Sequence, residues 1–126
     1  MPNKRILLID DEPDIHTIVQ LGLEMEAQWE MLTALSGDEG IDIAVAEHPD
    51  AILLDAMMPV RDGIATLEVL HSQPETQNIP VIFLTAKAQA ANRRQFYSLG
   101  AKGVITKPFD PITLASQIAG FLSWSL

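Results

Sequence analysis

The sequence contains no cysteine among its 126 residues. This absence excludes a thiolate nucleophile, a cysteine-based zinc site and a disulfide scaffold. A chain without disulfides is compatible with a reducing cytoplasm. Its length fits one ordinary domain, since domains typically run about 100–150 residues. A chain of this size can bury a core without covalent or metal cross-links.

Positive charge and long apolar runs are also scarce. The chain has 8 Lys and Arg against 17 Asp and Glu, which gives a net charge of −9. The adjacent basic pairs are Lys4-Arg5 and Arg93-Arg94, and they do not form the basic stripe that nucleic-acid binders show. No apolar run approaches the roughly 20 residues of a membrane span, and Ile6–Ile9 is too short for the core of a secretory signal. We therefore expect a soluble cytoplasmic protein that contacts neither nucleic acid nor a membrane directly.

Short apolar runs alternate with longer stretches of helical spacing. The apolar runs are Ile6–Ile9, Met31–Leu35, Ala51–Leu54, Val81–Leu84 and Gly103–Thr106. Runs that are apolar on both faces are typical of buried parallel strands. The stretches between them place apolar residues on one helical face, three or four residues apart, as at Ile15, Ile18, Val19 and Gly22. The strict alternation predicts an α/β fold with a doubly wound, five-stranded parallel sheet and five helices, in one domain.

Polar side chains follow four of the predicted strands. Asp10 and Asp11 follow the first strand, Asp55 the third, Thr85 the fourth and Lys107 the fifth. In an open parallel sheet, ligands bind beyond the carboxyl ends of the strands, near the point where the strand order reverses. We therefore expect these carboxylates, the hydroxyl and the amine to converge at one edge of the sheet.

Carboxylates that share one site repel one another. Two like charges about 4 Å apart repel by about 1 kcal/mol in water and about 4 kcal/mol at an effective dielectric constant of 20. Either one carboxyl group takes up a proton, or a hard cation lies among the oxygens, and Lys107 supplies one further positive charge. Mg²⁺ suits this site, because it binds one or two carboxylates together with water and phosphate oxygens. The site thus predicts a Mg²⁺ cofactor and a phosphoryl group as substrate.

Each of these residues has a simpler interpretation when it is taken alone. An acidic residue after a strand, such as Asp11 or Glu12, often caps the next helix. Asp55 is harder to explain in this way, since a lone buried carboxylate is costly. Other phosphate sites fit less well: the sequence has neither a Gly-x-Gly-x-x-Gly nor a Walker-type motif. Met57 stands where a haloacid-dehalogenase-like phosphatase has its second acid.

The order and spacing of these residues resemble the receiver domain of two-component response regulators, over about residues 4–123. The segments that carry the resemblance are Asp10-Asp11, Leu53-Leu54-Asp55-Ala56-Met57-Met58-Pro59 with Asp62-Gly63, Thr85-Ala86, Gly100-Ala101 and Lys107-Pro108-Phe109. Each segment alone is weakly diagnostic, but together they are specific. The resemblance implies a single receiver domain over residues 1–126, similar to the single-domain chemotaxis regulators, with a flavodoxin-like sheet of strand order 2-1-3-4-5.

The resemblance also implies the reacting groups. Asp55 is the implied phosphoacceptor, which attacks a phosphohistidine and becomes an aspartyl phosphate. Mg²⁺ is implied to bind Asp11 directly, Asp10 through water, and also Asp55 and the backbone carbonyl of Met57. The implied phosphoryl donor is a sensor histidine kinase or a histidine phosphotransfer protein, whereas the downstream protein target stays open.

Further residues are implied to bind the phosphoryl group or to shape the pocket. Thr85 is implied to hydrogen-bond the phosphoryl oxygens, and Lys107 to pair with them. The Lys107–Pro108 peptide bond is implied to be cis, an uncommon feature. Pro59 and Gly63 are implied to shape the loop after the phosphoacceptor.

One position departs from the family pattern, and three histidines lie outside it. Many receivers carry an aromatic side chain three residues before the lysine, and its rotamer reports phosphorylation; here this position holds Val104. We therefore expect the fourth helix or its loop to carry the signal instead. His16, His48 and His71 are scattered on predicted helices. Because a phosphorelay histidine needs a helical bundle around it, we expect all three at the surface.

These features predict a phosphoacceptor switch of a two-component or phosphorelay system. It would be a signalling domain rather than an enzyme, one that catalyses its own phosphorylation and dephosphorylation. Phosphorylation would shift the conformation around Thr85 and the fourth helix, and so control a protein partner. Output is expected through a separate protein, unless the chain is a receiver excised from a longer one. The alternatives are a phosphorylation-independent protein-binding module on the same fold and a small metal-dependent phosphatase.

Overall fold

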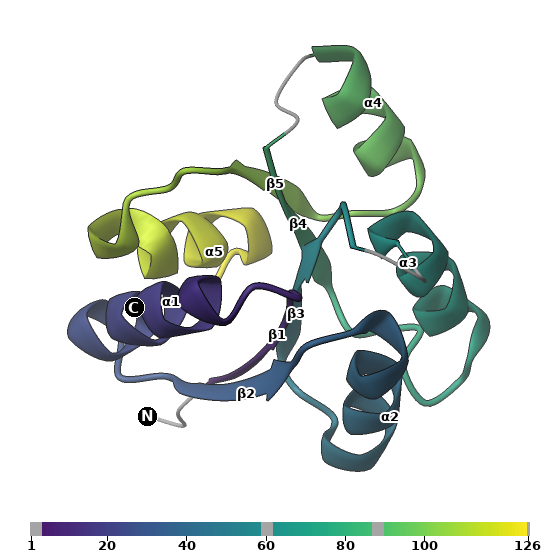
Figure 1. Ribbon diagram of the computed structural model, residues 1–126, viewed down its shortest axis with the longest axis horizontal. Coiled ribbons are helices and arrows are strands. Elements are labelled where there is room, and N and C mark those ends of the chain that lie inside the picture. The colour runs from purple at the N-terminus through teal and green to yellow at the C-terminus, as the bar shows by residue number, and fades with distance from the viewer. Residues whose placement is uncertain (1–3, 59–61, 87–89, 126) are drawn as a thin grey trace.

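The computed structural model describes residues 4–58, 62–86 and 90–125, and their strands and helices alternate along the chain (Figure 1). The strands are β1 (Arg5–Ile9), β2 (Glu30–Ala34), β3 (Ala51–Asp55), β4 (Val81–Thr85) and β5 (Gly103–Thr106). The helices are α1 (Pro13–Glu26), α2 (Gly37–Glu47), α3 (Gly63–Ser72), α4 (Ala90–Ser98) and α5 (Leu114–Leu122), with a short 3₁₀ helix η1 (Pro111–Thr113) before α5. The predicted fold class is confirmed.

The five strands form one parallel sheet in the order β2-β1-β3-β4-β5, which confirms the order implied by the resemblance. The chain runs from β1 to β2 on one side, and then crosses to β3 on the other side of β1. The strand order therefore reverses between β1 and β3, where Ile9 lies opposite Leu54. The crevice beyond the carboxyl ends of these two strands is the place where such sheets bind ligands.

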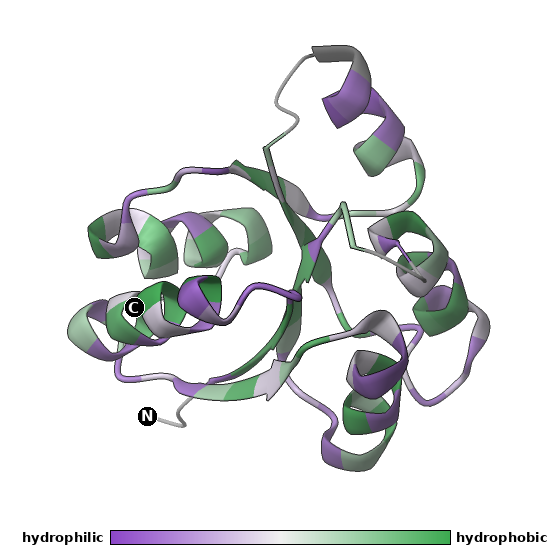
Figure 2. Cartoon of the chain, viewed as in Figure 1, coloured by the Kyte–Doolittle hydropathy of each residue, from purple (hydrophilic) through white to green (hydrophobic). Residues whose placement is uncertain are grey.

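The central strands are apolar on both faces because helices cover both faces of the sheet. Figure 1 shows α1 and α5 on one side and α2, α3 and α4 on the other, and Figure 2 shows the hydrophobic residues concentrated in the sheet between them. Every residue of β3 and β4 is buried. Side chains alternate between the two cores: Leu53 packs on the side of α1 and α5, and Leu54 on the opposite side. Two cores thus fix the sheet and, with it, the residues at the strand ends.

The structure corrects the prediction at β2 and at α1. Strand β2 begins and ends one residue earlier than predicted, and Leu35 lies beyond it with 51% of its surface exposed. In helix α1 the buried residues are His16, Val19, Gly22 and Leu23. Val19 and Gly22 were on the predicted apolar face, whereas Ile18, also placed there, is 38% exposed. Within the described ranges of the chain, no helix has the length and apolar character needed to cross a membrane.

Candidate functional site

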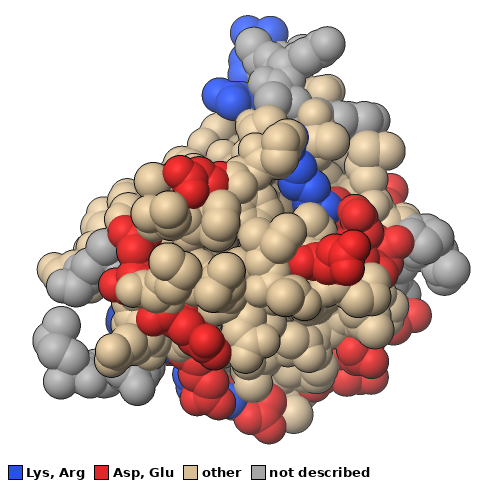
Figure 3. All heavy atoms as spheres, turned by 60° about the vertical axis from the view of Figure 1, so that its left-hand side comes forward, with Lys and Arg blue, Asp and Glu red and all other residues tan. Residues whose placement is uncertain are grey.

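Acidic side chains are distributed widely over the protein surface. On the face shown in Figure 3 they are scattered over most of the area, whereas basic side chains gather mainly at the top, where Figure 1 places α4. Arg93 and Arg94 of this helix are exposed. An excess of acidic charge favours cations and basic partner surfaces.

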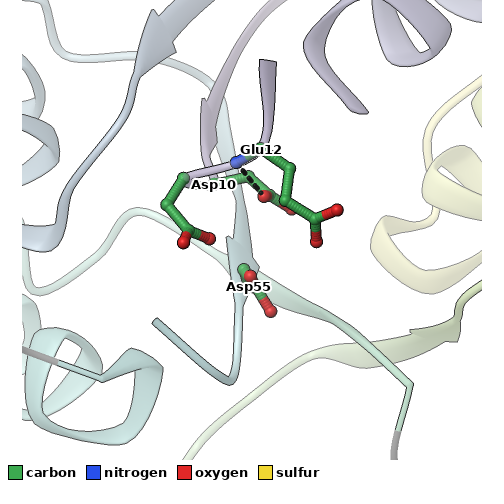
Figure 4. A group of neighbouring side chains, drawn as sticks. Asp10, Glu12 and Asp55 are labelled. Carbon is green, nitrogen blue, oxygen red and sulfur yellow. Dashed lines mark hydrogen bonds between the residues drawn. The ribbon is translucent and has the colours of Figure 1, made fainter. Parts of the chain in front are cut away.

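Two carboxylates lie buried at the carboxyl edge of the sheet, at the point where the strand order reverses. Asp10 follows β1 directly and is 0% exposed, and Asp55 is the last residue of β3 and 4% exposed. Because β1 and β3 are adjacent and parallel, their ends lie side by side. Figure 4 shows the side chains of Asp10, Glu12 and Asp55 gathered around one space.

Asp10 is held by hydrogen bonds at every polar group. Its backbone N–H donates to the carbonyl oxygen of Ala34 at 3.1 Å. Its Oδ1 accepts from the backbone N–H of Glu12 at 2.9 Å, and its Oδ2 accepts from Nζ of Lys107 at 2.9 Å. Its carbonyl oxygen accepts from Nε2 of His16 at 2.7 Å. A buried carboxylate with this many partners has a fixed orientation.

Lys107 reaches three carboxylates from the end of β5. Its Nζ lies 2.9 Å from Oδ2 of Asp10, 3.4 Å from Oε1 of Glu12 and 3.6 Å from Oδ2 of Asp55. The lysine side chain is only 14% exposed. One ammonium group among several carboxylates leaves a net negative charge in the pocket.

The pKa values in the pocket reflect this imbalance. The pKa of Asp55 is raised from 3.8 to about 6. Burial is the largest cause, and the charges of Asp10 and Asp11 act in the same direction; the backbone N–H of Met57 and the charge of Lys107 lower the pKa and offset part of the rise. Burial lowers the pKa of Lys107, but its hydrogen bond to Asp10 and the surrounding carboxylates outweigh this, so the net shift is upward. The pocket therefore attracts positive charge.

A cation could lie among four carboxyl groups of this pocket. Asp10, Asp11, Glu12 and Asp55 each offer an oxygen within 4.8 Å of the others. A donor set made of carboxylate oxygens fits a hard cation such as Mg²⁺ and not a soft metal. The sequence predicted three of these residues as ligands and treated Glu12 only as a helix-capping residue.

The residues after β3 are positioned by the backbone around Asp55. The N–H of Met57 donates to Oδ1 of Asp55 at 3.0 Å, and the Met57 side chain is 54% exposed. Gly63 begins α3 where a Cβ atom would meet the carbonyl oxygen of Asp55 and lie 2.7 Å from Cα of Ala56. Only glycine allows this close approach. Pro59, also predicted to shape this loop, lies outside the described residues.

Thr85 and Lys107 meet at the ends of β4 and β5. Thr85 is fully buried, its carbonyl oxygen accepts from the backbone N–H of Lys107 at 2.8 Å, and it lies opposite Thr106 in the sheet. The peptide bond between Lys107 and Pro108 is cis.

Val104 is 8% exposed and packs in the core on the side of α2, α3 and α4. On the surface above it, Nη2 of Arg93 contacts Oγ1 of Thr106 at 3.4 Å.

His16 is the residue near the pocket that the sequence analysis missed. It was expected at the surface, but it is only 8% exposed and contacts the backbone of Asp10. The expectation for His16 is wrong because this side chain lies on the buried face of α1, together with Val19 and Leu23. Val19 and Leu23 follow His16 by three and seven residues, a spacing that places all three on one face of a helix and could have indicated that His16 is buried.

The comparisons with known proteins agree with this arrangement. The family model of the response regulator receiver domain matches residues 6–119. The chain is 38% identical over 118 residues to the DNA-binding dual master transcriptional regulator RpaA of Synechocystis sp., covering 94% of this chain and 48% of that protein. It is also 38% identical over 122 residues to the phosphate regulon transcriptional regulatory protein PhoB of Pseudomonas aeruginosa, covering 97% and 53%. The chain thus spans about half the length of these curated relatives.

Solved structures also resemble this chain, and in these matches nearly the whole of the compared chain is covered. The chemotaxis response regulator CheY4 of Vibrio cholerae superimposes with a TM-score of 0.88 at 28% sequence identity, covering 95% of this chain and 99% of that one. A CheY-like receiver domain protein from Methanospirillum hungatei has a TM-score of 0.84 at 29% identity, covering 97% and 95%.

The relatives correct the prediction about nucleic acid. We expected partners that include no nucleic acid, but similar proteins are named as DNA-binding or transcriptional regulators. The prediction is wrong because it rested on the net charge of −9, which describes this chain alone. This charge carries no information about what the other half of such a protein binds.

The family model covers most of the chain, and the strand order, the acidic pocket and the relatives agree with it. The chain belongs to the family of response regulator receiver domains of two-component systems.

Proposed function

We propose that this receiver domain is a phosphoacceptor switch in which Asp55 takes a phosphoryl group from a phosphohistidine with the help of Mg²⁺. The observation that carries the proposal is the convergence of two buried carboxylates and one partly buried amine at the ends of three separate strands: Asp10, Asp55 and Lys107. A structural role alone does not account for this, because carboxylates in excess over cations inside a protein are costly.

Asp55 is the nucleophile of the proposed reaction. One of its carboxylate oxygens attacks phosphorus, the P–N bond to the donor histidine breaks, and the leaving ring nitrogen keeps the electron pair and later takes up a proton. The product is an aspartyl phosphate. The hydrogen bond from the N–H of Met57 to Oδ1 fixes the carboxylate, so that Oδ2 is the oxygen placed to react. The charge of Lys107, 3.6 Å from Oδ2, stabilises the negative oxygens of the transferred group.

In this proposal Mg²⁺ is held by the carboxylates of Asp11 and Asp55 and the backbone carbonyl of Met57, and by Asp10 through water. The oxygens of the three carboxylates lie within 4.8 Å of one another, which fits one cation. When bound, Mg²⁺ supplies positive charge to the phosphoryl oxygens. Asp10 is held in place by four hydrogen bonds, so its carboxylate has a fixed position in the pocket.

The proposed output runs from Thr85 to α4. Phosphorylation replaces a carboxylate by a group of about −1.5 to −2 charge, which attracts the hydroxyl of Thr85. Thr85 lies opposite Thr106, and Thr106 contacts Arg93 of α4. With Val104 in place of an aromatic side chain, this polar contact links the pocket to α4. A complete switch needs about 5.5 kcal/mol of differential interaction between the two states.

A labelling experiment tests the proposal. The protein is incubated with Mg²⁺ and acetyl phosphate, and intact mass spectrometry looks for an increase of one phosphoryl group that is stable in acid and lost in base. We expect labelling of the wild type and none of Asp55→Asn. Asp62→Asn is the matched control, because Asp62 is an exposed carboxylate that caps α3 nearby, and asparagine also caps helices.

The other outcomes identify the alternative functions. Release of phosphate without a labelled protein would indicate a metal-dependent phosphatase. Absence of both labelling and Mg²⁺ binding would indicate a binding module that works without phosphorylation. Equal labelling of wild type and Asp55→Asn would contradict the assignment of Asp55.

A further inference from the structure

A buried histidine on α1 holds the backbone of the acidic turn. His16 is 8% exposed, and its Nε2 lies 2.7 Å from the carbonyl oxygen of Asp10. A carbonyl oxygen only accepts hydrogen bonds, so Nε2 is the nitrogen that carries the hydrogen here. The other ring nitrogen, Nδ1, is buried and has no hydrogen-bond partner among the described residues. The contact with Asp10 is therefore the polar interaction of this ring.

The hydrogen bond from His16 restrains the peptide group between two of the acidic residues of the pocket. The carbonyl group of Asp10 belongs to the peptide that joins Asp10 to Asp11. The other partners of Asp10 are the backbone of Ala34, the N–H of Glu12 and the ammonium group of Lys107. Of these four partners, His16 is the one that belongs to α1. Its hydrogen bond restrains the peptide group that joins the two carboxylate residues.

We infer that His16 is a positioning residue of the metal and phosphoryl pocket: through its hydrogen bond to the Asp10 carbonyl it orients Asp10 and Asp11 toward Asp55. The inference rests on the proposed function and extends it to a residue that touches neither the metal nor the phosphoryl group. Removal of a group that hydrogen-bonds to a metal ligand without touching the metal typically weakens metal affinity by about 10–100-fold. His16 acts in this way on the backbone of the ligand turn.

A pair of substitutions separates positioning from packing. In His16→Gln the side-chain amide can still donate to the Asp10 carbonyl, but it fills less space than an imidazole ring. In His16→Leu an apolar side chain fills the space and donates nothing. If His16 acts only by packing, the leucine variant resembles the wild type; if it positions the turn, the glutamine variant does. His71→Leu is the matched control: it makes the same change at a histidine outside the pocket, in the last turn of α3 and close to Gly100.

The measurement is the Mg²⁺ dissociation constant of the protein alone, by isothermal titration calorimetry, with the amide NMR shifts of Asp10 and Asp11 as a second readout. We expect His16→Leu to weaken Mg²⁺ binding about tenfold and to shift both amides before metal is added. His16→Gln and His71→Leu are expected to stay within about threefold of the wild type. If His16→Leu does not fold, His16→Met serves as the variant without a donor.

Two results would overturn the inference. One is a leucine or methionine variant that binds Mg²⁺ like the wild type; the other is a glutamine variant that binds as weakly as the leucine variant. Failure of the proposed function is distinguishable from both, because then the wild type itself shows neither Mg²⁺ binding nor labelling of Asp55.

Discussion

Strand β1 and its neighbours carry charged clusters at both ends of the sheet, and the two clusters differ in burial. At the amino end, Nη2 of Arg5 lies 2.7 Å from Oε1 of Glu47, and its Nε lies 3.9 Å from Oε2 of Glu30. These side chains are 32%, 49% and 61% exposed. At the carboxyl end, Lys107 is 14% exposed, and the Asp10 and Asp55 side chains beside it are 0% and 5% exposed.

The difference in burial changes what each cluster does for the protein. Exposed ion pairs contribute about 0–1 kcal/mol to stability, because water screens them and the side chains lose freedom. Buried carboxylates in excess over cations work against stability, and the raised pKa of Asp55 records this. The amino end is thus a weak surface contact, and the carboxyl end keeps a costly arrangement that suits cation and phosphoryl binding.

Removal of the buried cation is expected to have the largest effect. Lys107→Met leaves the buried charges of Asp10 and Asp55 without the ammonium group that contacts both. We expect the free energy of unfolding in EDTA at pH 7 to fall by about 3–5 kcal/mol, measured by urea denaturation. Lys102→Met, at an exposed lysine near β5, is the control. A loss no larger than that of the control would contradict this description of the pocket.

Removal of the buried negative charge is expected to stabilise the protein at neutral pH. The carboxyl group of Asp55 has a pKa of about 6 in the folded protein and 3.8 as its ordinary value. The folded state therefore binds this proton more tightly, so the contribution to stability is present below pH 4 and is lost as the pH rises through about 6. The full difference corresponds to about 3 kcal/mol. In EDTA at pH 7 we expect Asp55→Asn to be more stable than the wild type by about 1–3 kcal/mol.

The pH dependence sharpens this prediction. Urea denaturation of wild type and Asp55→Asn between pH 4 and pH 8 should give stabilities that lie close together near pH 4, diverge between pH 4 and about pH 6, and run parallel above that. Asp62→Asn should follow the wild type. Parallel curves for wild type and Asp55→Asn over the whole range would show that burial does not raise the pKa of Asp55.

Removal of the exposed cation is expected to have the smallest effect. Arg5→Met breaks the contacts of the guanidinium group with Glu47 and Glu30. We expect the free energy of unfolding to fall by about 1 kcal/mol or less, and the difference to shrink in high salt because exposed charges are screened. A loss as large as that of Lys107→Met would remove the contrast between the two ends of the sheet.

Much of the fold was predictable, because the buried strands are apolar on both faces and stand between helical stretches. The strands that lie in the middle of the sheet, such as β3 and β4, were predicted to within one residue. The edge strand β2 was shifted by one residue, because its half-exposed residues give a weaker apolar pattern. The face of α1 was predicted in part: Val19 is buried as expected, but Ile18 is 38% exposed, because the two neighbouring residues both fit a helical stripe and packing decides which one is buried.

The site was predictable where a residue ends a strand, and not where a residue reaches the pocket from a helix. Parallel strands end at one edge, so Asp10, Asp55 and Lys107 were expected to meet. The proposed role of His16 depends on a hydrogen bond to a backbone carbonyl. Every residue has such a carbonyl, so the sequence does not indicate which residue accepts the bond. Glu12 reaches Lys107 through a side chain that is 60% exposed, and side-chain rotamers of this kind cannot be read from sequence spacing.

The stability of the protein with and without Mg²⁺ tests most directly whether the carboxyl end of the sheet is a cation site. Urea denaturation at pH 7 is compared in EDTA and in excess Mg²⁺, for the wild type and for Asp55→Asn. Ligands that bind the folded state stabilise it according to their concentration and dissociation constant. We therefore predict that Mg²⁺ raises the urea concentration at the unfolding midpoint of the wild type. The difference in stability between the wild type and the more stable Asp55→Asn should become smaller in Mg²⁺ than in EDTA. An unfolding midpoint of the wild type that is the same in Mg²⁺ and in EDTA would contradict the account.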